Sequence, residues 1–347
     1  MRILTIVGAR PQFVKAAAVS KALAAQGIDE IMVHSGQHYD PQMSDIFFSE
    51  LEMLSPAYNL GIHGANHGAM TGRMLAGVEE IILKEKPDWV LVYGDTNSTL
   101  AGALAAAKLH VPVAHVEAGL RSFNRKMPEE INRILSDHVS SLLFCPTRLS
   151  VENLKNEGIV SGVQMVGDVM MDATLAAMKI AQTKSHILEK LSLCDGEYSL
   201  ATIHRAENTD DPRQLAAVMR YLEDKARERP VILPLHPRTK AALAREGITP
   251  LRVRIIEPVG YLDMQRLLGA SAEVFTDSGG LQKEAYFHRK RCTTLRDQTE
   301  WVETIENGWN RLWQVEEYLP RHDIEEYGGG MAAQRIASVM TTAATTP

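Results

Sequence analysis

The sequence predicts an α/β protein built from two doubly wound, Rossmann-like domains with parallel sheets. Short apolar runs alternate with helical patterns along nearly the whole chain, as a series of βα units requires. Most of these runs are apolar at successive positions, which is typical of strands buried on both faces of a sheet. The chain has 347 residues, and this length favours two cores of about 150–170 residues over a single one.

The first half begins with the apolar run Ile3 to Val7, which Gly8 ends. A helix is expected from Arg10, because Pro11 suits a first helical turn, and Gly27 closes it. The other strands expected in this half lie at 31–34, 89–93, 111–116, 142–145 and 163–166. Helices are expected at 71–86, after 96, from 129 and at 147–157.

A second βα series follows a hinge predicted within 167–196. Its strands are expected at 200–203, 231–235, 253–256 and 272–276, and a further strand is expected before the polar loop 296–301. A polar residue directly follows the carboxyl end of each of the first four strands, and these residues are His204, His236, Glu257 and Asp277. We therefore place the two domains at 1–168 and 169–328, with a C-terminal helix within 329–347.

The bulk composition excludes several classes of protein. With 45% hydrophobic and 23% charged residues, the chain has an ordinary globular composition. Its net charge of −6 and its lack of a Lys/Arg block argue against nucleic acid or an anionic membrane as a partner. No stretch reaches the ~18 successive apolar residues of a membrane span. The N-terminus is typical of a buried strand rather than of a signal peptide.

The cysteines and histidines predict neither a disulfide scaffold nor a metal site. Three cysteines occur far apart, at positions 145, 194 and 292, which fits a reducing cytoplasm. Two histidine pairs, 34/38 and 63/67, have the spacing of zinc ligands on one helix. Gly36 and Gly64 interrupt these pairs, so helical register is not expected there and no metal is predicted.

Three acidic residues stand where the chain changes from one element to the next. Asp95 follows the strand at 89–93, Glu117 follows the strand at 111–116, and Glu129 opens a helix. Because ligands bind beyond the carboxyl ends of parallel strands, these carboxylates are candidates for one acid–base site. The alternative is structural, since Asp95 can cap the next helix and Glu129 can lie at the positive end of a helix dipole.

Other residues predict an anion site. The run from Asp277 to Gly280 precedes a helical pattern, so backbone N–H groups and a helix N-terminus would face a phosphate. His204 and Arg205 add a titratable and a cationic side chain after another strand. Arg10 places a cation at the first helix, where no G-x-G-x-x-G fingerprint occurs. The alternative for the glycine run is a simple N-cap without a ligand.

Five long strings of the sequence resemble the non-hydrolysing UDP-N-acetylglucosamine 2-epimerase family. They are VYGDTNSTLAG, HVEAGLRSFNRKMPEEINR, HRAENTDDP, VFTDSGGLQKEA and LRDQTEWVET. The resemblance implies a GT-B-type architecture, in which the two domains face a cleft and the C-terminal helix crosses back to the first domain. It also implies a cytoplasmic homodimer that acts on a UDP-sugar with no metal and no nicotinamide cofactor.

The resemblance also implies roles for particular residues. The implied acid–base residues are Asp95, Glu117, Glu129 and His204. UDP or sugar binding falls to Arg10, Lys15, Arg205, His236, Tyr261, Ser278, Gly279 and Gly280, with Glu284 at the ribose. A second, regulatory substrate site is implied at Gln37, His38, Gln42 and Arg73. The structural alternatives are a solvated helix face for Lys15 and an ordinary loop for the regulatory positions.

The implied reaction is the inversion of C2 in a UDP-2-acetamido sugar, which interconverts UDP-GlcNAc and UDP-ManNAc. Because C2 bears nitrogen, a simple ketone route is not available, and the C2 proton is not acidic enough for direct removal. Loss of UDP from C1 together with the C2 proton gives a glycal instead. Protonation from the other face and return of UDP complete the inversion. Crowded carboxylates would allow one acid to hold a proton at neutral pH.

Four alternatives to this function are open. The strings GARPQFVK and DQTEWVE, together with YGGG, look similar to the family branch that acts on UDP-2,3-diacetamido-2,3-dideoxyglucuronate, an O-antigen precursor. The same chemistry on that sugar is the nearest alternative. A hydrolysing epimerase, a GT-B glycosyltransferase and a non-catalytic nucleotide-sugar sensor are the others.

Overall fold

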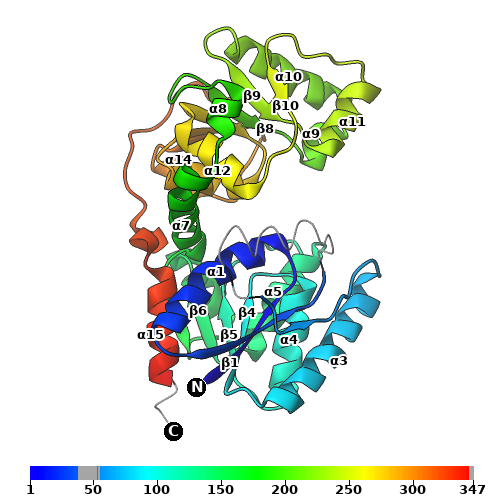
Figure 1. Ribbon diagram of the computed structural model, residues 1–347, viewed down its shortest axis with the longest axis vertical. Helices are drawn as coiled ribbons and strands as arrows, with labels where there is room; N and C mark the ends of the chain where they lie inside the picture. Colours follow the sequence, from blue (N-terminus) through cyan, green and yellow to red (C-terminus); the bar gives the residue numbers. More distant parts are fainter. Residues whose placement is uncertain (38–52, 54, 344–347) are drawn as a thin grey trace. The chain divides into compact units, whose positions relative to one another are not determined.

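The computed structural model describes residues 1–37, 53 and 55–343, and the chain divides into two compact units. The first unit comprises Met1–Ala173 and Glu325–Pro347, and the second comprises Thr174–Ile324 (Figure 1). The last helix of the chain therefore belongs to the same unit as the first strand.

The first unit is built on a parallel sheet, which has seven strands within the described residues. Their order is β3-β2-β1-β4-β5-β6-β7. The strands are β1 (Arg2–Val7), β2 (Asp29–His34), β3 (Tyr58–Asn59), β4 (Trp89–Tyr93), β5 (Val113–Val116), β6 (Leu142–Cys145) and β7 (Val163–Met165). The strand order reverses between β1 and β4, and open α/β sheets bind ligands at such a point.

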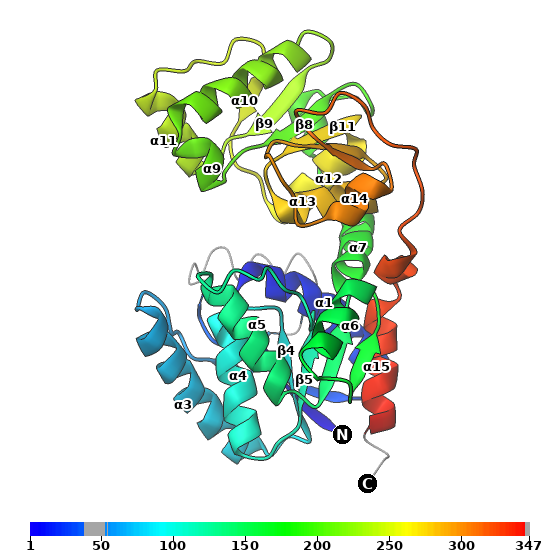
Figure 2. The ribbon, with the colours of Figure 1, turned by 180° about the vertical axis from the view of Figure 1, so that it is seen from behind.

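Helices cover both faces of this sheet because side chains of β1 alternate between two cores. Ile3 and Val7 pack with α1 (Arg10–Ala25) and α15 (Ala332–Ala343). Leu4 and Ile6 pack in the other core, which includes side chains of α3 (His67–Glu85) and α4 (Asn97–Lys108). Figure 2 shows α1 and α15 on one side of the sheet and α3 and α4 on the other. The unit is completed by α5 (Pro128–Val139), α6 (Arg148–Asn156) and the 3-10 helix η1 (Glu325–Gly330).

The second unit has a parallel sheet of six strands in the described part of the chain, in the order β10-β9-β8-β11-β12-β13. They are β8 (Ser199–Thr202), β9 (Val231–Pro234), β10 (Arg254–Ile256), β11 (Glu273–Thr276), β12 (Arg291–Thr294) and β13 (Asn310–Leu312). Counted from its own first strand, this is the 3-2-1-4-5-6 order of the Rossmann fold. The order reverses between β8 and β11.

Two cores cover the faces of the second sheet, one around Leu215 and Val218 and the other around Leu267 and Leu268. Helix α7 (Val169–Lys184) begins in the first unit and ends in the second. The other helices are α8 (Ile187–Leu191), α9 (Ala206–Thr209), α10 (Pro212–Lys225), α11 (Pro237–Arg245), α12 (Tyr261–Ala270), α13 (Gly279–Phe287) and α14 (Val302–Glu306). No helix in the described ranges combines the length and the apolar character needed to cross a membrane.

The predicted fold class, an α/β chain with two Rossmann-like units, is confirmed. The sequence patterns do not predict β3 or β13, which have two and three residues. Such short strands show no periodicity, and pairing with β2 and β12 defines them instead. Strand boundaries differ from the expected ones by a residue or two, as at Val113–Val116, because the apolar run begins before the ladder does.

Candidate active site

Asp95 lies directly beyond β4, at the edge of the sheet where the strand order reverses. Its Oδ2 accepts hydrogen bonds from Arg133 of α5, at 2.6 Å from Nη2 and 3.0 Å from Nε. The side-chain amide of Asn132 donates to the Asp95 backbone carbonyl at 2.9 Å. Thr96, rather than Asp95, is the N-cap of α4 and accepts the Thr99 N–H. The Asp95 carboxylate is therefore held by α5 and is not used to cap the next helix.

Glu117 lies beyond β5, and its buried carboxylate forms an ion pair with the buried ammonium of Lys15 from α1. Its backbone has a φ of +70°, a left-handed conformation that costs a non-glycine residue about 1–3 kcal/mol and is common at functional sites. The N–H groups of Glu117 and Ala118 both donate to the Phe144 carbonyl at 3.1 Å, which holds this turn in place.

The loops that carry the two carboxylates are in contact. A Cβ atom added to Gly94 would lie 3.4 Å from Oε2 of Glu117 and 4.0 Å from Nζ of Lys15. The Gly94 N–H also donates to the Val116 carbonyl at 2.9 Å. The structure thus brings the regions of Asp95 and Glu117 together, as their positions at adjacent strand ends predict. Each carboxylate pairs with its own cation, which differs from the crowded carboxylates that we expected to share a proton.

Glu129 is exposed in the first turn of α5, and Glu130 is the buried acid of that turn. Glu130 accepts hydrogen bonds from the N–H and hydroxyl of Ser122, both at 2.9 Å, and from Arg133 Nη1 at 2.8 Å. Burial alone would raise the pKa of Glu130, but these bonds and the Phe123 N–H outweigh it and lower that pKa. Glu129 precedes Arg133 by four residues and lies on the same face of the helix.

Gln12, which the sequence patterns do not single out, joins the two loops at this edge of the sheet. Its Oε1 accepts the N–H groups of Gly8 and Ala9 at 2.8 and 3.0 Å. Its Nε2 donates to the Tyr93 carbonyl at 2.7 Å. The loop after β1, where Arg10 is exposed, is thereby fixed to the loop after β4, where Asp95 lies.

Asp277 is a buried residue of the second unit that connects two loops, as Gln12 does in the first unit. It follows β11, and its carboxylate accepts the backbone N–H groups of His204 and Arg205, each at 2.9 Å, and the Asn208 side chain at 3.0 Å. These donors lie in the segment after β8, so Asp277 joins the two loops at the reversal of strand order. Asp277 therefore anchors the backbone of His204 and Arg205, and their side chains stay at the surface.

His204 is close to several charged groups. Burial lowers its pKa, and the Asp277 carboxylate opposes this, while the charges of Arg205, His236 and Arg238 lower it further. The net direction is down, so the neutral imidazole is the dominant form at neutral pH. Its ring centroid lies 5.8 Å from that of His236, which caps α11 and accepts the Arg238 N–H at 3.2 Å.

The segment Ser278–Gly280 forms the start of α13. The Ser278 hydroxyl caps the helix by accepting the Leu281 N–H at 3.5 Å. A Cβ atom on Gly279 would lie 2.3 Å from Oε1 of Glu300, so a side chain cannot be added without displacing that carboxylate. Glu300 in turn pairs with Arg296 at 2.9 Å, and its other oxygen lies 4.0 Å from Arg205. The helix start therefore lies beside a cluster of charged side chains.

Glu284 lies one turn further along α13, and its Oε2 accepts a hydrogen bond from the Gln265 amide at 2.9 Å. Gln265 Oε1 lies 2.6 Å from His288 Nε2, and burial together with the charge of Lys290 lowers the His288 pKa to about 4. Tyr261 is buried at the first residue of α12.

The implied regulatory residues are described only in part. Gln37 accepts hydrogen bonds from the Ser98 N–H at 3.1 Å and the Ser98 hydroxyl at 2.9 Å, and Arg73 is exposed on α3. His38 and Gln42 lie outside the described residues. Among residues 1–37, 53 and 55–343, no three His, Cys, Asp or Glu side chains form a group that could hold a metal ion.

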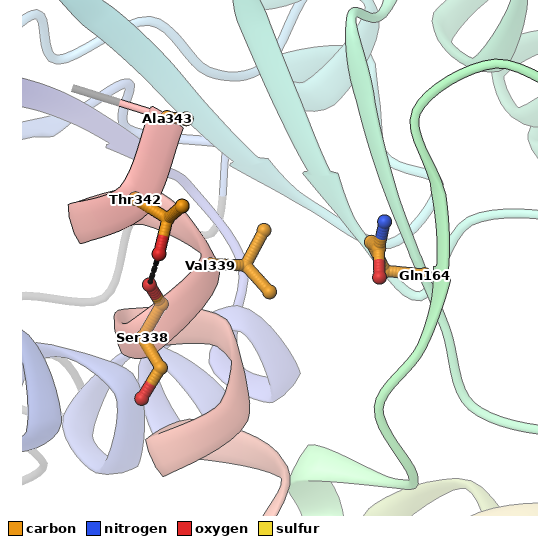
Figure 3. Close-up of a pocket in the computed structure, with 5 residues that line it drawn as sticks. All are labelled: Gln164, Ser338, Val339, Thr342 and Ala343. Carbon is orange, nitrogen blue, oxygen red and sulfur yellow. Dashed lines mark hydrogen bonds between the residues drawn. The ribbon is translucent and has the colours of Figure 1, made fainter. Parts of the chain in front are cut away.

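A cavity of about 390 Å³ lies elsewhere in the first unit. It is lined by Gln164, Ser338, Val339, Thr342 and Ala343. Figure 3 shows that Val339 of α15 points toward Gln164 of β7 across it. None of the lining side chains is charged or titrates near neutral pH, so this cavity offers no acid or base for proton transfer.

Comparison with known proteins gives the family of the chain. Residues 21–341 match the family model described as UDP-N-acetylglucosamine 2-epimerase. The chain is 53% identical to the UDP-2,3-diacetamido-2,3-dideoxy-D-glucuronate 2-epimerase of Pseudomonas aeruginosa, over 98% of this chain and 99% of that protein. It is 41% identical to the UDP-N-acetylglucosamine 2-epimerase of Methanocaldococcus jannaschii, over 98% of this chain and 99% of that protein.

Solved structures agree with this assignment. The M. jannaschii UDP-GlcNAc 2-epimerase, solved in complex with UDP-GlcNAc and UDP, has a TM-score of 0.84 and covers 99% of this chain and 100% of its own. The Neisseria meningitidis UDP-GlcNAc 2-epimerase, solved with UDP-GlcNAc, is 28% identical, has a TM-score of 0.87 and covers 99% of this chain and 100% of its own. These relatives confirm the GT-B-type fold class and show that the chain belongs to the UDP-N-acetylglucosamine 2-epimerase family.

Proposed function

We propose that the protein catalyses the reversible epimerisation of UDP-GlcNAc and UDP-ManNAc at C2. The observation that carries the proposal is the pair Asp95 and Glu117, which lie at adjacent strand ends and are each held by a cation. The solved M. jannaschii relative, 41% identical, was crystallised with UDP-GlcNAc and UDP, and this supports the choice of a UDP-2-acetamido sugar as substrate.

The C2 proton is too weakly acidic to be removed by itself, so its removal is coupled to the departure of UDP. One carboxylate removes the C2 proton, the C2–H electron pair forms a C1=C2 bond, and the C1–O bond breaks so that its electrons leave with UDP. The glycal is then protonated at C2 from the opposite face by the other acid, and a UDP oxygen returns to C1. We assign the two proton transfers to Asp95 and Glu117, with Glu129 as a third candidate beside Arg133. General acid–base help of this kind contributes about 10²–10⁴-fold in rate.

The leaving UDP is assigned to residues of the second unit, with Arg10 and Lys15 of the first as further contacts. The N–H groups at the start of α13, from Gly279 and Gly280, offer a positive helix end to a phosphate. Arg205 and His204 follow β8 and are anchored by Asp277, and a neutral His204 can donate one N–H to a phosphate oxygen. We assign Glu284 to the ribose, because its carboxylate can accept hydrogen bonds from two hydroxyl groups.

A second candidate is the same chemistry on UDP-2,3-diacetamido-2,3-dideoxyglucuronate. The 53% identity to the P. aeruginosa epimerase of that sugar, over nearly the full length of both proteins, favours it. The two substrates share the UDP group and the C2 acetamido group, so the site residues keep the same roles. They differ at C3 and at C6, which carries a carboxylate in the uronate.

Incubation of each sugar nucleotide in deuterium oxide tests both candidates. Proton NMR should show deuterium entering C2 of the product as the epimer forms, because a carboxylic acid exchanges its proton with solvent before donating it. The sugar with the higher kcat/KM is the substrate. Retention of the original proton at C2 in the epimer contradicts the elimination route. Accumulation of free UDP, seen by phosphorus NMR, would indicate a hydrolysing enzyme instead.

We further propose that the protein works as a homodimer in the cytoplasm. Three apolar side chains near or on α5 stay exposed in the single chain, with exposed fractions of 37% for Met127, 46% for Ile131 and 47% for Leu135. Their spacing places them on one stripe of the helix, which a second copy could cover. Sedimentation equilibrium should give twice the 38.4 kDa mass of the chain; a mass that stays at the monomer value at micromolar concentration contradicts the dimer.

A further inference from the structure

His115 lies in β5, two residues before Glu117, and is completely buried. Its Nδ1 lies 2.7 Å from Oδ1 of Asp137 in α5, and its Nε2 lies 2.7 Å from the backbone carbonyl oxygen of Gly94. Both distances are those of short hydrogen bonds. Both nitrogens of a buried ring are thus in contact with an oxygen.

The two oxygens determine the protonation state of the ring. A backbone carbonyl only accepts, so Nε2 must carry a hydrogen. Asp137 is bound as a carboxylate, because its other oxygen accepts the Gly119 N–H at 3.1 Å and the Arg121 guanidinium at 2.7 Å. Nδ1 must therefore carry a hydrogen as well, and a ring with two N–H groups is a cation.

The charges around His115 favour the same doubly protonated ring. Burial alone lowers the pKa of His115, but its hydrogen bond to Asp137, the Asp137 charge, the Gly94 carbonyl and the Glu117 charge outweigh burial and raise that pKa above its ordinary value. Burial likewise opposes ionisation of Asp137, yet His115 and Arg121 lower the pKa of Asp137. The neighbouring thiol of Cys145 in β6 stays neutral, because burial raises its pKa to about 12.

The ring is bonded to the backbone that carries both carboxylates. Gly94, whose carbonyl accepts from Nε2, directly precedes Asp95 and has a φ of +63°. Glu117 follows His115 by two residues and is itself left-handed, with a φ of +70°. A change in the ring's hydrogen bonds would release the Gly94 carbonyl and Oδ1 of Asp137 together, and so shift Asp95 and the turn at Glu117.

We propose that His115 is a doubly protonated positioning residue, whose two N–H groups fix the turns from which Asp95 and Glu117 project. Its positive charge also offsets the negative charge that Glu117 and Asp137 bring into the interior. The role in turnover rests on the proposed function, because it requires Asp95 and Glu117 to be the reacting groups. The protonation state is independent of that function and can be measured alone.

Nitrogen NMR of the wild-type protein labelled with ¹⁵N-histidine measures the protonation state directly. At pH 7 both His115 nitrogens should show the shift of an N–H nitrogen. The buried His288 provides an internal control, since its pKa of about 4 keeps it neutral with one unprotonated nitrogen. An unprotonated nitrogen on His115 at pH 7 would overturn the proposal, whatever the enzyme does to its substrate. The His115 signals are those that disappear from the spectrum of His115→Gln. Where that variant does not fold, through-space contacts between the ring and Asp137 identify the His115 signals.

Kinetics of His115→Gln measure the positioning role. Glutamine can donate only through its amide and carries no charge, so kcat should fall about 10–100-fold while KM stays within about threefold. The control is His186→Gln, since the His186 side chain is 84% exposed and should tolerate the change. Unchanged kcat in a folded His115→Gln protein would contradict the proposal, as would a loss confined to KM.

The pH dependence links the two measurements. Because the folded pKa of His115 is raised, its double donation is complete below the ordinary histidine pKa and is lost as the pH rises through the raised value. In the wild type, kcat should therefore fall at alkaline pH in step with the loss of one N–H signal from His115. A kcat that stays constant while that signal is lost would overturn the positioning role.

Discussion

Replacing Asp95 with Asn is expected to lower epimerisation turnover about 10²–10⁴-fold while the Kd for UDP changes by less than about threefold. Asparagine keeps the size of the side chain but cannot accept or return the C2 proton. The groups assigned to the diphosphate, Gly279, Arg205 and His204, lie in the other unit and are unchanged. Turnover by proton NMR and UDP binding by calorimetry measure the two quantities separately.

Asp29→Asn is the matched control for this substitution, because Asp29 forms a surface ion pair with Arg2 at 2.9 Å and is 60% exposed. Exposed pairs of this kind contribute about 0–1 kcal/mol, so the control should keep its turnover and its stability. Epimerisation at the wild-type rate by Asp95→Asn would remove Asp95 from the mechanism. A loss of UDP binding as large as the loss of turnover would place it in substrate binding instead.

Replacing Asp277 with Asn is expected to raise the Kd for UDP more than about tenfold and to lower the free energy of unfolding by about 2–4 kcal/mol. The Asp277 carboxylate accepts the N–H groups of His204 and Arg205 and the Asn208 amide in a fully buried place. All three bonds go to one oxygen, Oδ2, so an amide oxygen at that place would still accept them but without the negative charge that strengthens them. The NH₂ group would then replace Oδ1, which accepts the His204 N–H at 3.1 Å, and the segment that carries His204 and Arg205 would be held less firmly at the sheet.

Asp210→Asn is the control for this second substitution. Asp210 pairs with the Arg238 guanidinium at 2.7 Å, but its side chain is 61% exposed, so water replaces the lost interaction. Urea unfolding and calorimetric titration with UDP give the two measurements. If Asp277→Asn keeps the wild-type free energy of unfolding and the wild-type Kd for UDP, the anchor is not needed for UDP binding.

The two units use the same kind of connection at the place where their strand order reverses. In the first unit Gln12 bonds the turn after β1 to the end of β4, and in the second Asp277 bonds the turn after β8 to the end of β11. Gln12 bonds backbone groups of both connected segments, whereas Asp277 lies after β11 itself and accepts backbone N–H groups of the segment after β8. Such loops lack ladder partners for many of their backbone groups, and these side chains supply some of the missing hydrogen bonds. We infer that both connections keep the loops rigid for a ligand.

Much of the fold follows from local patterns. Continuous apolar runs such as Ile3 to Val7 predict strands buried on both faces, and polar residues directly after such runs predict the edge of the sheet where ligands bind. Asp95, Glu117, His204 and Asp277 are found at that edge by this rule alone. The pattern fails for β3 and β13, because strands of two or three residues are too short to show a period.

The sequence by itself determined the α/β class, the doubly wound architecture and the strand ends that carry the candidate site, since these depend on hydrophobic patterns of a few successive residues. Only the tertiary structure decided which charges meet. Lys15 reaches Glu117 across 102 positions and Arg133 reaches Asp95 across 38, and the buried acid of α5 is Glu130 rather than the exposed Glu129. No local pattern specifies such pairs, because the energy of a charge depends on its distance from other charges and from water, and the packing of the whole unit sets both distances.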